Sequence, residues 1–421
     1  MIEITEEYQQ VLDLINNKTT PIFVTGGAGS GKSTLISYIQ EKYRNVVTVA
    51  PTGIAALNVN GSTIHSTFRM PPKFILPFDK KQLRGNSVLA NADIIIIDEI
   101  SMVNANMLDT MEYIMRISKQ SKVAFGGTPV VMFGDLYQLP PVVTDETRKL
   151  FSENYDTPYF FSANCLKRAS MKTVKLTKVF RQNDDTFVNV LNNIRMGTDV
   201  ETALEYINSK VRFIDKAEKG CIVVTTTNRK CNEINNFHLR RIKLEEHTFM
   251  GKIEGKFNPS SIPVDSIVDL KVGTQVMVAK NIEGAVNGTL GTVTAIHNNN
   301  VHVKTNDDEL LNISKAVWES VKYTTRGKKV EKVVVGSYTQ IPLKLAWAIT
   351  VHKGQGQTMN NIHIDMDTGA FASGQIYVAL SRCRTLEGIT LSRPLYTSDI
   401  IVDDDVREFY NNVDNNQYEV V

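Results

Sequence analysis

The sequence contains little cysteine, and neither sign of charge is in strong excess. Among its 421 residues, Cys165, Cys221, Cys231 and Cys383 are the 4 cysteines, and they form no Cys-x-x-Cys pair. That spacing argues against a zinc site, an iron–sulfur cluster or a disulfide framework, and it indicates a reducing compartment. The 47 basic and 45 acidic residues give a net charge of +2. This balance excludes a polyanion-binding tail, so any nucleic acid would have to bind in a local basic groove.

Long apolar runs and a leader segment are also missing. No apolar stretch approaches the ~20 residues that a membrane-spanning helix needs. The acidic start, Met1-Ile-Glu-Ile-Thr-Glu-Glu, has no apolar signal core. We therefore expect no membrane association and a cytoplasmic protein, nucleoid-associated if the host is bacterial or viral. The 42% hydrophobic and 22% charged content is ordinary for a globular chain, and the length predicts two to four domains.

A glycine-rich segment, Gly26-Gly-Ala-Gly-Ser-Gly-Lys-Ser33, fits G-x-x-x-x-G-K-[ST] at every fixed position. The apolar run 22–24 before it predicts a strand, and Leu35, Ile36 and Ile39 after it have helical spacing. Glycines let backbone N–H groups surround an anion, and a helix N-terminus attracts phosphate. We expect Lys32 to reach the β- and γ-phosphates of ATP and Ser33 to hold Mg²⁺. The predicted cradle consists of Gly26, Gly27, Ala28, Gly29, Ser30, Gly31, Lys32, Ser33 and Thr34.

Polar residues follow two further apolar runs. The run Ile94–Ile97 predicts a buried strand beside that of the cradle, and it ends in Asp98 and Glu99. We expect Asp98 to bind the metal through Ser33 and water, and Glu99 to polarise the attacking water. After a predicted strand at 130–133, Gln138 is placed to bond the γ-phosphate and to report its loss. The two carboxylates favour hydrolysis over nucleotide storage.

Two arginines outside the first domain are candidates for stabilising the transferred phosphoryl group. They are Arg181, and Arg382 on an expected helix at 377–382. An arginine from another element can neutralise the charge that builds on the γ-phosphate oxygens. If both belong to a second domain, ATP lies between two domains. By itself, an arginine at either position is more often a solvated surface residue.

The pattern of strands predicts more than one folded unit. Residues 1 to about 167 read as a parallel α/β unit, with strands at 22–25, 46–50, 94–97 and 130–133. A second α/β pattern starts near Val174, with a strand at 222–226 and a helix to 236. Short alternating strands within 268–340 predict a small β-barrel. Residues 68–90, rich in proline and aromatics, predict an insertion in the first unit.

The motifs, in this order, resemble superfamily 1 helicases, and more closely the Pif-one family of the 5′-to-3′ branch, which also contains RecD and Dda-type enzymes. The matching segments cover most of the chain: Gly26–Ser33, Ala50–Ala56, Gly61–Ser66, Asp98–Met102, Phe125–Val142, Leu176–Gln182, Ala346–Thr358 and Tyr377–Arg382. The resemblance implies an α/β fold of two RecA-like P-loop domains with parallel sheets. It implies a first domain at 1–167 with a wedge at 68–90, and a second domain at 168–291 and 339–421. An SH3-like β-barrel would be inserted at 292–338.

The same resemblance implies an ATP-driven motor that moves 5′ to 3′ on single-stranded DNA. It would unwind duplexes, forks or structured DNA, with G-quadruplexes and RNA–DNA hybrids as further substrates. It would act in replication, recombination, repair or telomere and genome maintenance. ATP and Mg²⁺ are the implied cofactors. We expect a monomer whose further partners are single-strand-binding or replication proteins.

The resemblance also assigns roles to matched residues. Gln9 would read the adenine, although Tyr8 departs from the usual Glu-Gln context. Gln355 and Gly356 would connect the nucleotide site to the DNA site. The implied DNA contacts are Thr52, Gly53, His65, Thr227, Asn228, His352 and Lys353. Phe68, Phe74 and Trp347 are candidates for stacking on bases, with Phe74 as the best exposed one, although aromatics more often fill cores.

Other functions fit parts of the pattern. A P-loop small-molecule kinase would share the cradle, but the carboxylate pair and the Gln138 loop suit attack by water better. A DNA-dependent ATPase switch, or a translocase that displaces proteins without unwinding, would share every motif above. Stimulation of ATP hydrolysis by single-stranded DNA separates the motor from the first alternative, and strand displacement separates it from the second.

Overall fold

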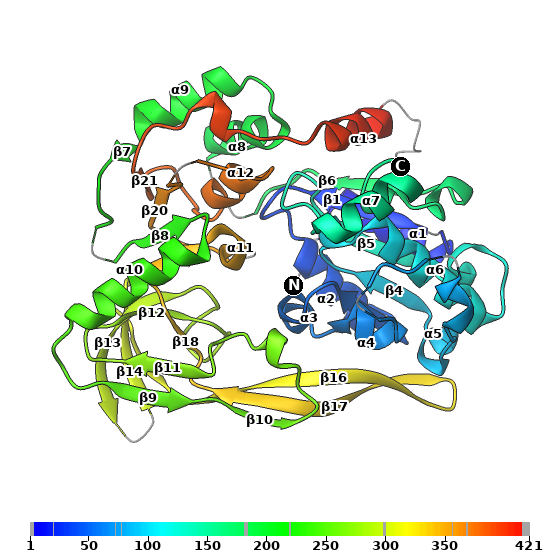
Figure 1. Cartoon of the computed structure of the whole chain (residues 1–421), viewed down its shortest axis with the longest axis horizontal. Helices are drawn as coiled ribbons and strands as arrows, with labels where there is room; N and C mark the ends of the chain where they lie inside the picture. Colours follow the sequence, from blue (N-terminus) through cyan, green and yellow to red (C-terminus); the bar gives the residue numbers. More distant parts are fainter. Residues whose placement is uncertain are drawn as a thin grey trace. The chain divides into compact units, whose positions relative to one another are not determined.

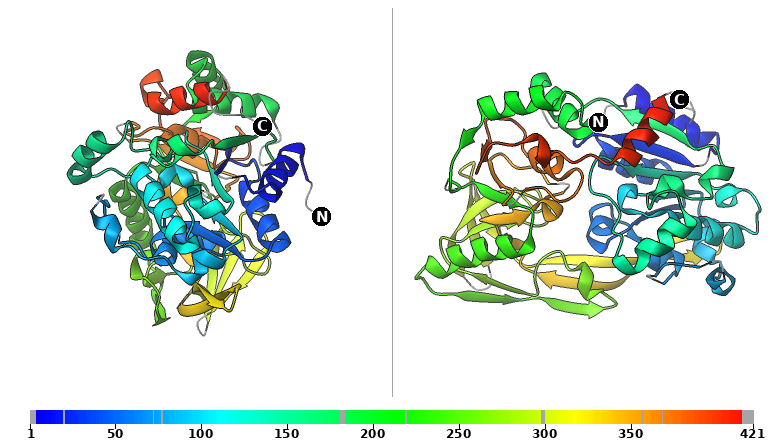
Figure 2. Two further views of the ribbon diagram at one scale, coloured as in Figure 1. Left: turned by 90° about the vertical axis from the view of Figure 1, so that its right-hand side faces the viewer. Right: turned by 45° about the horizontal axis from the view of Figure 1, so that its top comes forward.

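The computed structural model describes residues 4–19, 21–71, 73–76, 78–180, 184–218, 220–297, 300–355, 357–367 and 369–414. The chain divides into two compact units, each coloured along the sequence in Figures 1 and 2. The first comprises the chain to Phe180, the segment Ser320–Val335 and the chain from Asp403. The second comprises Arg181–Glu319 and Gly336–Val402. Among the described residues, no helix is both long and apolar enough to cross a bilayer.

The first unit is built on a six-stranded parallel sheet with the order β3-β2-β4-β5-β1-β6. Its strands are β1 (Ile22–Gly26), β2 (Val46–Ala50), β3 (Ser62–Thr63), β4 (Ile94–Ile97), β5 (Val130–Gly134) and β6 (Lys172–Leu176). The four strands predicted for this unit are confirmed. One expectation is wrong: β4 is not beside β1, because β5 lies between them. The strand that ends before Gln138, rather than the strand that ends before Asp98, therefore pairs with the P-loop strand.

Both faces of this sheet are buried, as a parallel sheet with helices on both sides requires. In β4, Ile95 and Ile97 pack into one core while Ile94 and Ile96 pack into another, because alternate side chains point to opposite faces. The first core also holds an apolar stripe formed by Leu108, Met111, Ile114 and Met115. The helices of the unit are α1 (Glu6–Asn16), α2 (Lys32–Lys42), α3 (Gly53–Asn58), α4 (Ile64–Phe68), α5 (Ser87–Asn91), α6 (Ala105–Lys119), α7 (Asp145–Asn154) and α13 (Asp404–Asp414).

The second unit contains a five-stranded parallel sheet with the order β19-β8-β20-β21-β7. Its strands are β7 (Arg212–Phe213), β8 (Ile222–Thr225), β19 (Ala348–Thr350), β20 (Ile362–Asp365) and β21 (Ile389–Leu391). Its helices are α8 (Asp185–Met196), α9 (Val200–Lys210), α10 (Asn228–Arg241), α11 (Val351–Gly354) and α12 (Gln375–Leu380). Two parallel sheets and the family comparison below confirm the predicted α/β class.

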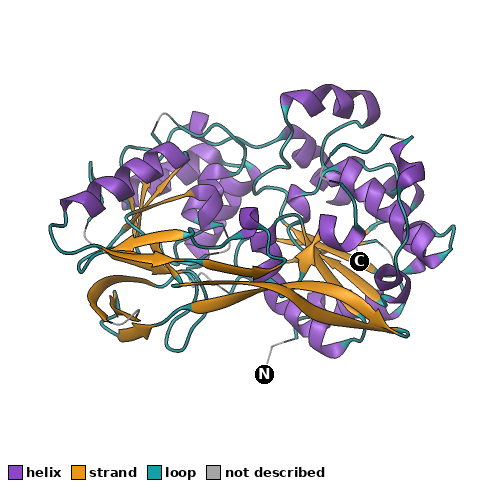
Figure 3. Ribbon diagram, turned by 60° about the horizontal axis from the view of Figure 1, so that its bottom comes forward, coloured by secondary structure: helices purple, strands orange, loops and turns teal. Residues whose placement is uncertain are grey.

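The remaining strands lie wholly or partly in the second unit and pair mainly antiparallel; Figure 3 draws every strand of the chain in orange. They are β9 (His247–Met250), β10 (Lys252–Gly255), β11 (Ile267–Leu270), β12 (Gln275–Val278), β13 (Leu290–His297), β14 (Asn300–Thr305), β15 (Leu310–Ile313), β16 (Ala316–Arg326), β17 (Lys329–Gln340) and β18 (Leu343–Leu345). The order β15-β14-β13-β12-β18 forms a single sheet. The short alternating strands predicted within 268–340 are confirmed by β12, β13, β14 and β17.

The long strands β16 and β17 reach beyond the second unit, because Ser320–Val335 belongs to the first. There the Tyr323 hydroxyl accepts a hydrogen bond from the Thr48 amide at 2.9 Å. Lys332 Nζ donates to the carbonyl of Asn60. The residues of these two compact units differ from the domain boundaries that the family resemblance implies, and those boundaries stay predictions.

Candidate nucleotide site and nucleic-acid interface

The glycine-rich loop connects β1 directly to the first turn of α2, as its motif predicts. Gly31 is the N-cap of α2 and has φ +84°, in the left-handed region that glycine tolerates best. Lys32 Nζ donates to the carbonyl oxygens of Gly26 at 2.7 Å and Gly27 at 3.0 Å. A Cβ at Gly26 would lie 2.6 Å from Ser30 Oγ and 2.8 Å from the Leu176 carbonyl oxygen. The loop is therefore closely packed, and its lysine ammonium lies within it.

Two aromatic residues hold this loop from outside the motif. The Tyr8 hydroxyl of α1 donates to the Gly31 carbonyl at 2.7 Å, and the Phe180 amide donates to the Gly29 carbonyl at 2.9 Å. Sequence reasoning missed both, because a contact across 23 residues or more leaves no local signal. Gln9 is exposed and donates through Nε2 to Asp13 Oδ1 at 2.8 Å. Its role in reading adenine stays a prediction.

The carboxylate pair follows β4. The Asp98 amide donates to the Val49 carbonyl at 2.9 Å. Burial raises the pKa of Asp98 to about 6, against the opposing effects of the Glu99 backbone and the Lys32 ammonium. Because burial outweighs the nearby Lys32 charge, the Asp98 carboxylate is only partly compensated, which suits a site completed by a divalent cation. Glu99 has φ +51°, a conformation that non-glycine residues adopt at a cost and that clusters at active sites.

The loop after β5 is held by its own aspartate. Asp135 is buried, and its carboxylate accepts hydrogen bonds from the Tyr137 amide at 3.2 Å and from Gln138 Nε2 at 3.4 Å. Gln138 is 7% exposed. The side-chain amide of Gln138 is therefore held within the first unit, in the loop that follows β5, and β5 pairs with β1.

Arg382 is fully buried in the second unit. It does not lie on a helix as expected, because α12 ends at Leu380 and Arg382 occupies the turn beyond it. Its guanidinium donates to the Val378 carbonyl at 2.8 Å and to Ser381 Oγ at 2.8 Å. Longer contacts of 3.3–3.4 Å reach the carbonyls of Gln357 and Gly354, on either side of Gln355. Arg181 and Gly356 lie outside the described residues.

In the first unit, the candidate DNA residues follow the carboxyl ends of adjacent strands. Thr52 comes two residues after β2 and caps α3, where its Oγ1 accepts from the Ala55 amide at 3.2 Å. Gly53 is the first residue of that helix. His65 comes two residues after β3, on α4, and burial lowers the pKa of its imidazole. Because β2 and β3 pair in parallel, these residues lie at the same edge of the sheet as the P-loop.

The second unit repeats this arrangement. Thr227 caps α10 after β8, and its Oγ1 accepts from the Lys230 amide at 3.3 Å; Asn228 follows it. His352 and Lys353 lie in α11, which directly follows β19. Since β8 and β19 are paired parallel neighbours, the structure brings these four candidates together at one edge.

The three aromatic candidates for base stacking differ in how exposed their side chains are. Phe68 is fully buried, so its proposed contact with bases is wrong. Phe74 is half-buried and packs edge-on against Phe151, with ring centroids 5.1 Å apart, whereas Phe78 in the same insertion is 64% exposed. Trp347 is half-buried and stacks on His238 at 5.4 Å.

A parallel sheet with a glycine loop, a lysine held against that loop and a strand-end carboxylate defines a P-loop nucleotide-binding fold. The model of the family described as PIF1-like helicase matches residues 3–204. Among solved structures, unliganded Pif1 from Bacteroides sp is 39% identical to this chain, covers 99% of both chains and has a TM-score of 0.90. Pif1 from Candida albicans is 28% identical, with a TM-score of 0.72.

Curated relatives agree with these structures. The ATP-dependent DNA helicase RRM3 of Saccharomyces cerevisiae is 28% identical over 98% of this chain and 68% of its own length. The ATP-dependent DNA helicase PIF1 of Homo sapiens is 30% identical over 92% of this chain and 60% of its own length. The chain thus spans about 60% of such a PIF1 relative. It belongs to the PIF1-like helicase family.

Proposed function

We propose that this chain is an ATP-dependent DNA helicase that translocates 5′ to 3′ on single-stranded DNA and unwinds duplex or structured DNA. The observation that carries the proposal is the similarity of 99% of this chain, at 38% identity, to two structures of Bacteroides Pif1. One of them is a complex with ADP-AlF4, and the other is bound to single-stranded DNA. The cradle, the Asp98–Glu99 pair and the strand-edge candidates of both units support it.

In the proposed reaction, the loop amides of 26–33 bind the phosphates and Lys32 moves from its loop carbonyls to the β- and γ-phosphates. Ser33 and Asp98 would hold Mg²⁺, which would neutralise charge on the phosphate oxygens. Glu99 would orient and deprotonate the attacking water. Gln138 would bond the γ-phosphate and lose that bond after hydrolysis.

The candidate interface supports sequence-independent binding. Hydroxyl, amide, imidazole and ammonium groups at the strand ends are suited to phosphate contacts, which position a strand without reading its bases. A similar structure, which concerns DNA unwinding at forked double-stranded DNA by two coordinating Pif1 helicases, supports forks as a substrate class. We propose a monomer as the free protein. Roles in replication, recombination and repair follow from this substrate class.

The decisive experiment compares duplexes that carry only a 5′ tail or only a 3′ tail. We expect strand displacement with the 5′ tail and ATP, and none with the 3′ tail. Lys32→Ala should abolish hydrolysis and unwinding while leaving DNA binding intact. ATP hydrolysis stimulated by single-stranded DNA, but without displacement of either duplex, would favour the ATPase switch instead.

A further inference from the structure

The exposed face of α10 carries basic side chains that the motifs leave unexplained. The opposite face is anchored: Asn235 Nδ2 donates to the Ala348 carbonyl at 2.9 Å, and Asn235 Oδ1 accepts from the Ala348 amide at 2.9 Å. Cys231 and Leu239 pack on the same buried side. Two hydrogen bonds to β19 therefore fix the helix to the strand that leads into His352 and Lys353.

A shallow depression of about 820 Å³ lies along the free face. The charged groups that line it are four cations, Arg229, Arg240, Arg241 and Lys243, and one carboxylate, Glu233. Phe237 in the same lining is 55% exposed, and Arg241 Cζ lies 5.2 Å from its ring centroid. An exposed aromatic ring among arginines is suited to base stacking beside phosphate contacts.

We propose that this face of α10 is a second nucleic-acid contact, which binds a segment of single-stranded DNA outside the strand-edge site. The helix begins at the candidate DNA residues Thr227 and Asn228 and, with its 14 residues, runs about 21 Å away from them. With the chain's net charge at only +2, a local excess of cations fits a polyanion. This inference rests on the proposed function.

The proposed contact on α10 is tested by comparing the binding of a short and a long oligonucleotide, because only the long one would reach both sites. Binding of fluorescein-labelled oligo-dT of about 8 and about 25 nucleotides is measured over a salt series with the full chain. In the variant Arg240→Glu/Lys243→Glu, we expect affinity for the longer oligonucleotide to fall about tenfold and its log–log salt slope to shrink by roughly 1.4, at about 0.7 for each lost phosphate contact. Affinity for the shorter one should not change. Lys210→Glu, an exposed charge reversal at the end of α9, is the matched control and should change neither.

Equal weakening of both lengths, or of neither, would overturn the proposal. In the second case, an acidic protein segment or a second copy of the chain becomes the occupant of α10. A wild-type chain that binds neither oligonucleotide would instead refute the proposed function itself.

A separate observation concerns the C-terminal helix α13, which returns to the first unit. Tyr410 Oη and Thr25 Oγ1 are 2.7 Å apart in a buried hydrogen bond, and the Tyr410 ring stacks on Tyr137 at 4.8 Å with 14° between planes. Thr25 directly precedes Gly26 of the P-loop, and Tyr137 directly precedes Gln138. One side chain thus touches the strand that feeds the cradle and the loop of the γ-phosphate sensor.

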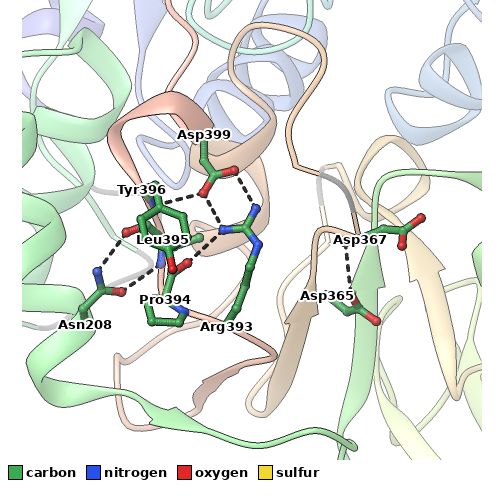
Figure 4. Close-up of polar contacts among 8 residues, drawn as sticks. All are labelled: Asn208, Asp365, Asp367, Arg393, Pro394, Leu395, Tyr396 and Asp399. Atoms are coloured by element: carbon green, nitrogen blue, oxygen red, sulfur yellow. Dashed lines mark hydrogen bonds and ion pairs between the residues drawn. The ribbon is translucent and has the colours of Figure 1, made fainter.

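The chain before this contact is firmly held at two places. Before the helix, within the second unit, Arg393 forms a two-pronged ion pair with Asp399 at 2.7 and 2.8 Å, and Asn208 exchanges hydrogen bonds with Leu395 (Figure 4). Within the first unit, Asp403 Oδ2 accepts from the Tyr159 hydroxyl at 2.8 Å. Only residues 400–402 separate the two anchored segments, so α13 is joined to the second unit by a short link.

We infer that Tyr410 is a positioning residue that keeps Gln138 and the P-loop in register during ATP hydrolysis. A shift of about 1 Å in such groups is enough to lower the rate up to a hundredfold. Tyr410→Phe keeps the stacked ring and removes only the hydroxyl. We expect it to lower kcat for DNA-stimulated hydrolysis several-fold, with KM for ATP within twofold. Tyr410→Leu, which also removes the ring, should lower kcat further.

The matched control is Tyr159→Phe, which removes the hydroxyl contact to Asp403 of this chain segment and lies in neither nucleotide loop. We expect it to lower the melting temperature as much as Tyr410→Phe does and to leave kcat unchanged. Thr25→Val should reproduce the kcat loss of Tyr410→Phe, and the double variant should lose no more than either one. If Tyr410→Phe and Tyr159→Phe have the same kcat, the contact is purely structural and the inference is wrong.

Discussion

Replacement of Arg382 by methionine tests the buried guanidinium most directly. Methionine fills much of the arginine stem but has no donors, so the bonds to the Val378 carbonyl and Ser381 Oγ, both 2.8 Å, are lost. Hydrogen bonds to a charged group contribute about 1.5–3 kcal/mol each, which sums to about 3–6 kcal/mol. We give the two contacts at 3.3–3.4 Å no weight because they are long.

An opposing term reduces this figure. A buried cation is costly to desolvate, and methionine removes that cost. We therefore expect a net loss of about 2–4 kcal/mol, because the Val378 carbonyl and Ser381 Oγ stay buried without the guanidinium. For a unit of this size, each kcal/mol lowers the melting temperature by about 2–4 °C, so the transition should fall by roughly 4–16 °C.

The assay is thermal unfolding followed by circular dichroism, together with DNA-stimulated ATP hydrolysis below the transition. Arg382→Lys keeps the charge but loses the planar fork, and it should destabilise less than methionine. If Arg382 also stabilises the transferred phosphoryl group, both variants lose hydrolysis at temperatures where they are folded. Arg384→Met, an exposed arginine two residues on, is the control and should melt like the wild type. A methionine variant at 382 that melts within 1 °C of the wild type would refute the bonding argument.

Two further outcomes follow from the structure. Gly31→Ala should weaken ATP binding in a nucleotide titration, because the added Cβ would lie 2.2 Å from the Tyr8 hydroxyl oxygen and the residue has φ +84°. Adding Tyr8→Phe to the same chain removes that oxygen and should restore part of the affinity. Of the four cysteines, Cys221 is half-buried and the other three are buried, and burial raises the pKa of the Cys221 thiol. A chromogenic disulfide reagent at neutral pH should therefore react slowly, with Cys221 first, and Cys221→Ser should remove that first phase; a burst of several thiols in the folded chain would contradict this.

The local parts of the site could be predicted from the sequence. The strand at 22–26, the glycine loop and the start of α2 are contiguous, so residue type and spacing specify them without knowledge of the rest. The same holds for Asp98 at the end of an all-isoleucine strand. Candidates that follow a strand end by two residues, such as Thr52 and Thr227, also reach the carboxyl edge of their sheet through local geometry.

Contacts between distant segments could not be predicted in this way. The position of β5 between β4 and β1 depends on how whole strands pair, and no single strand encodes its neighbours. The hydrogen bonds from Tyr8 to Gly31 and between Tyr410 and Thr25 join residues that are 23 and 385 positions apart. The burial of Phe68 likewise depends on the packed core around it. A side chain acquires such a partner only when the packed core brings the two segments together. The sequence by itself determined the phosphate-binding chemistry of the loop at 26–33 and the family of the chain. Only the tertiary structure decided which distant residues hold that loop in place.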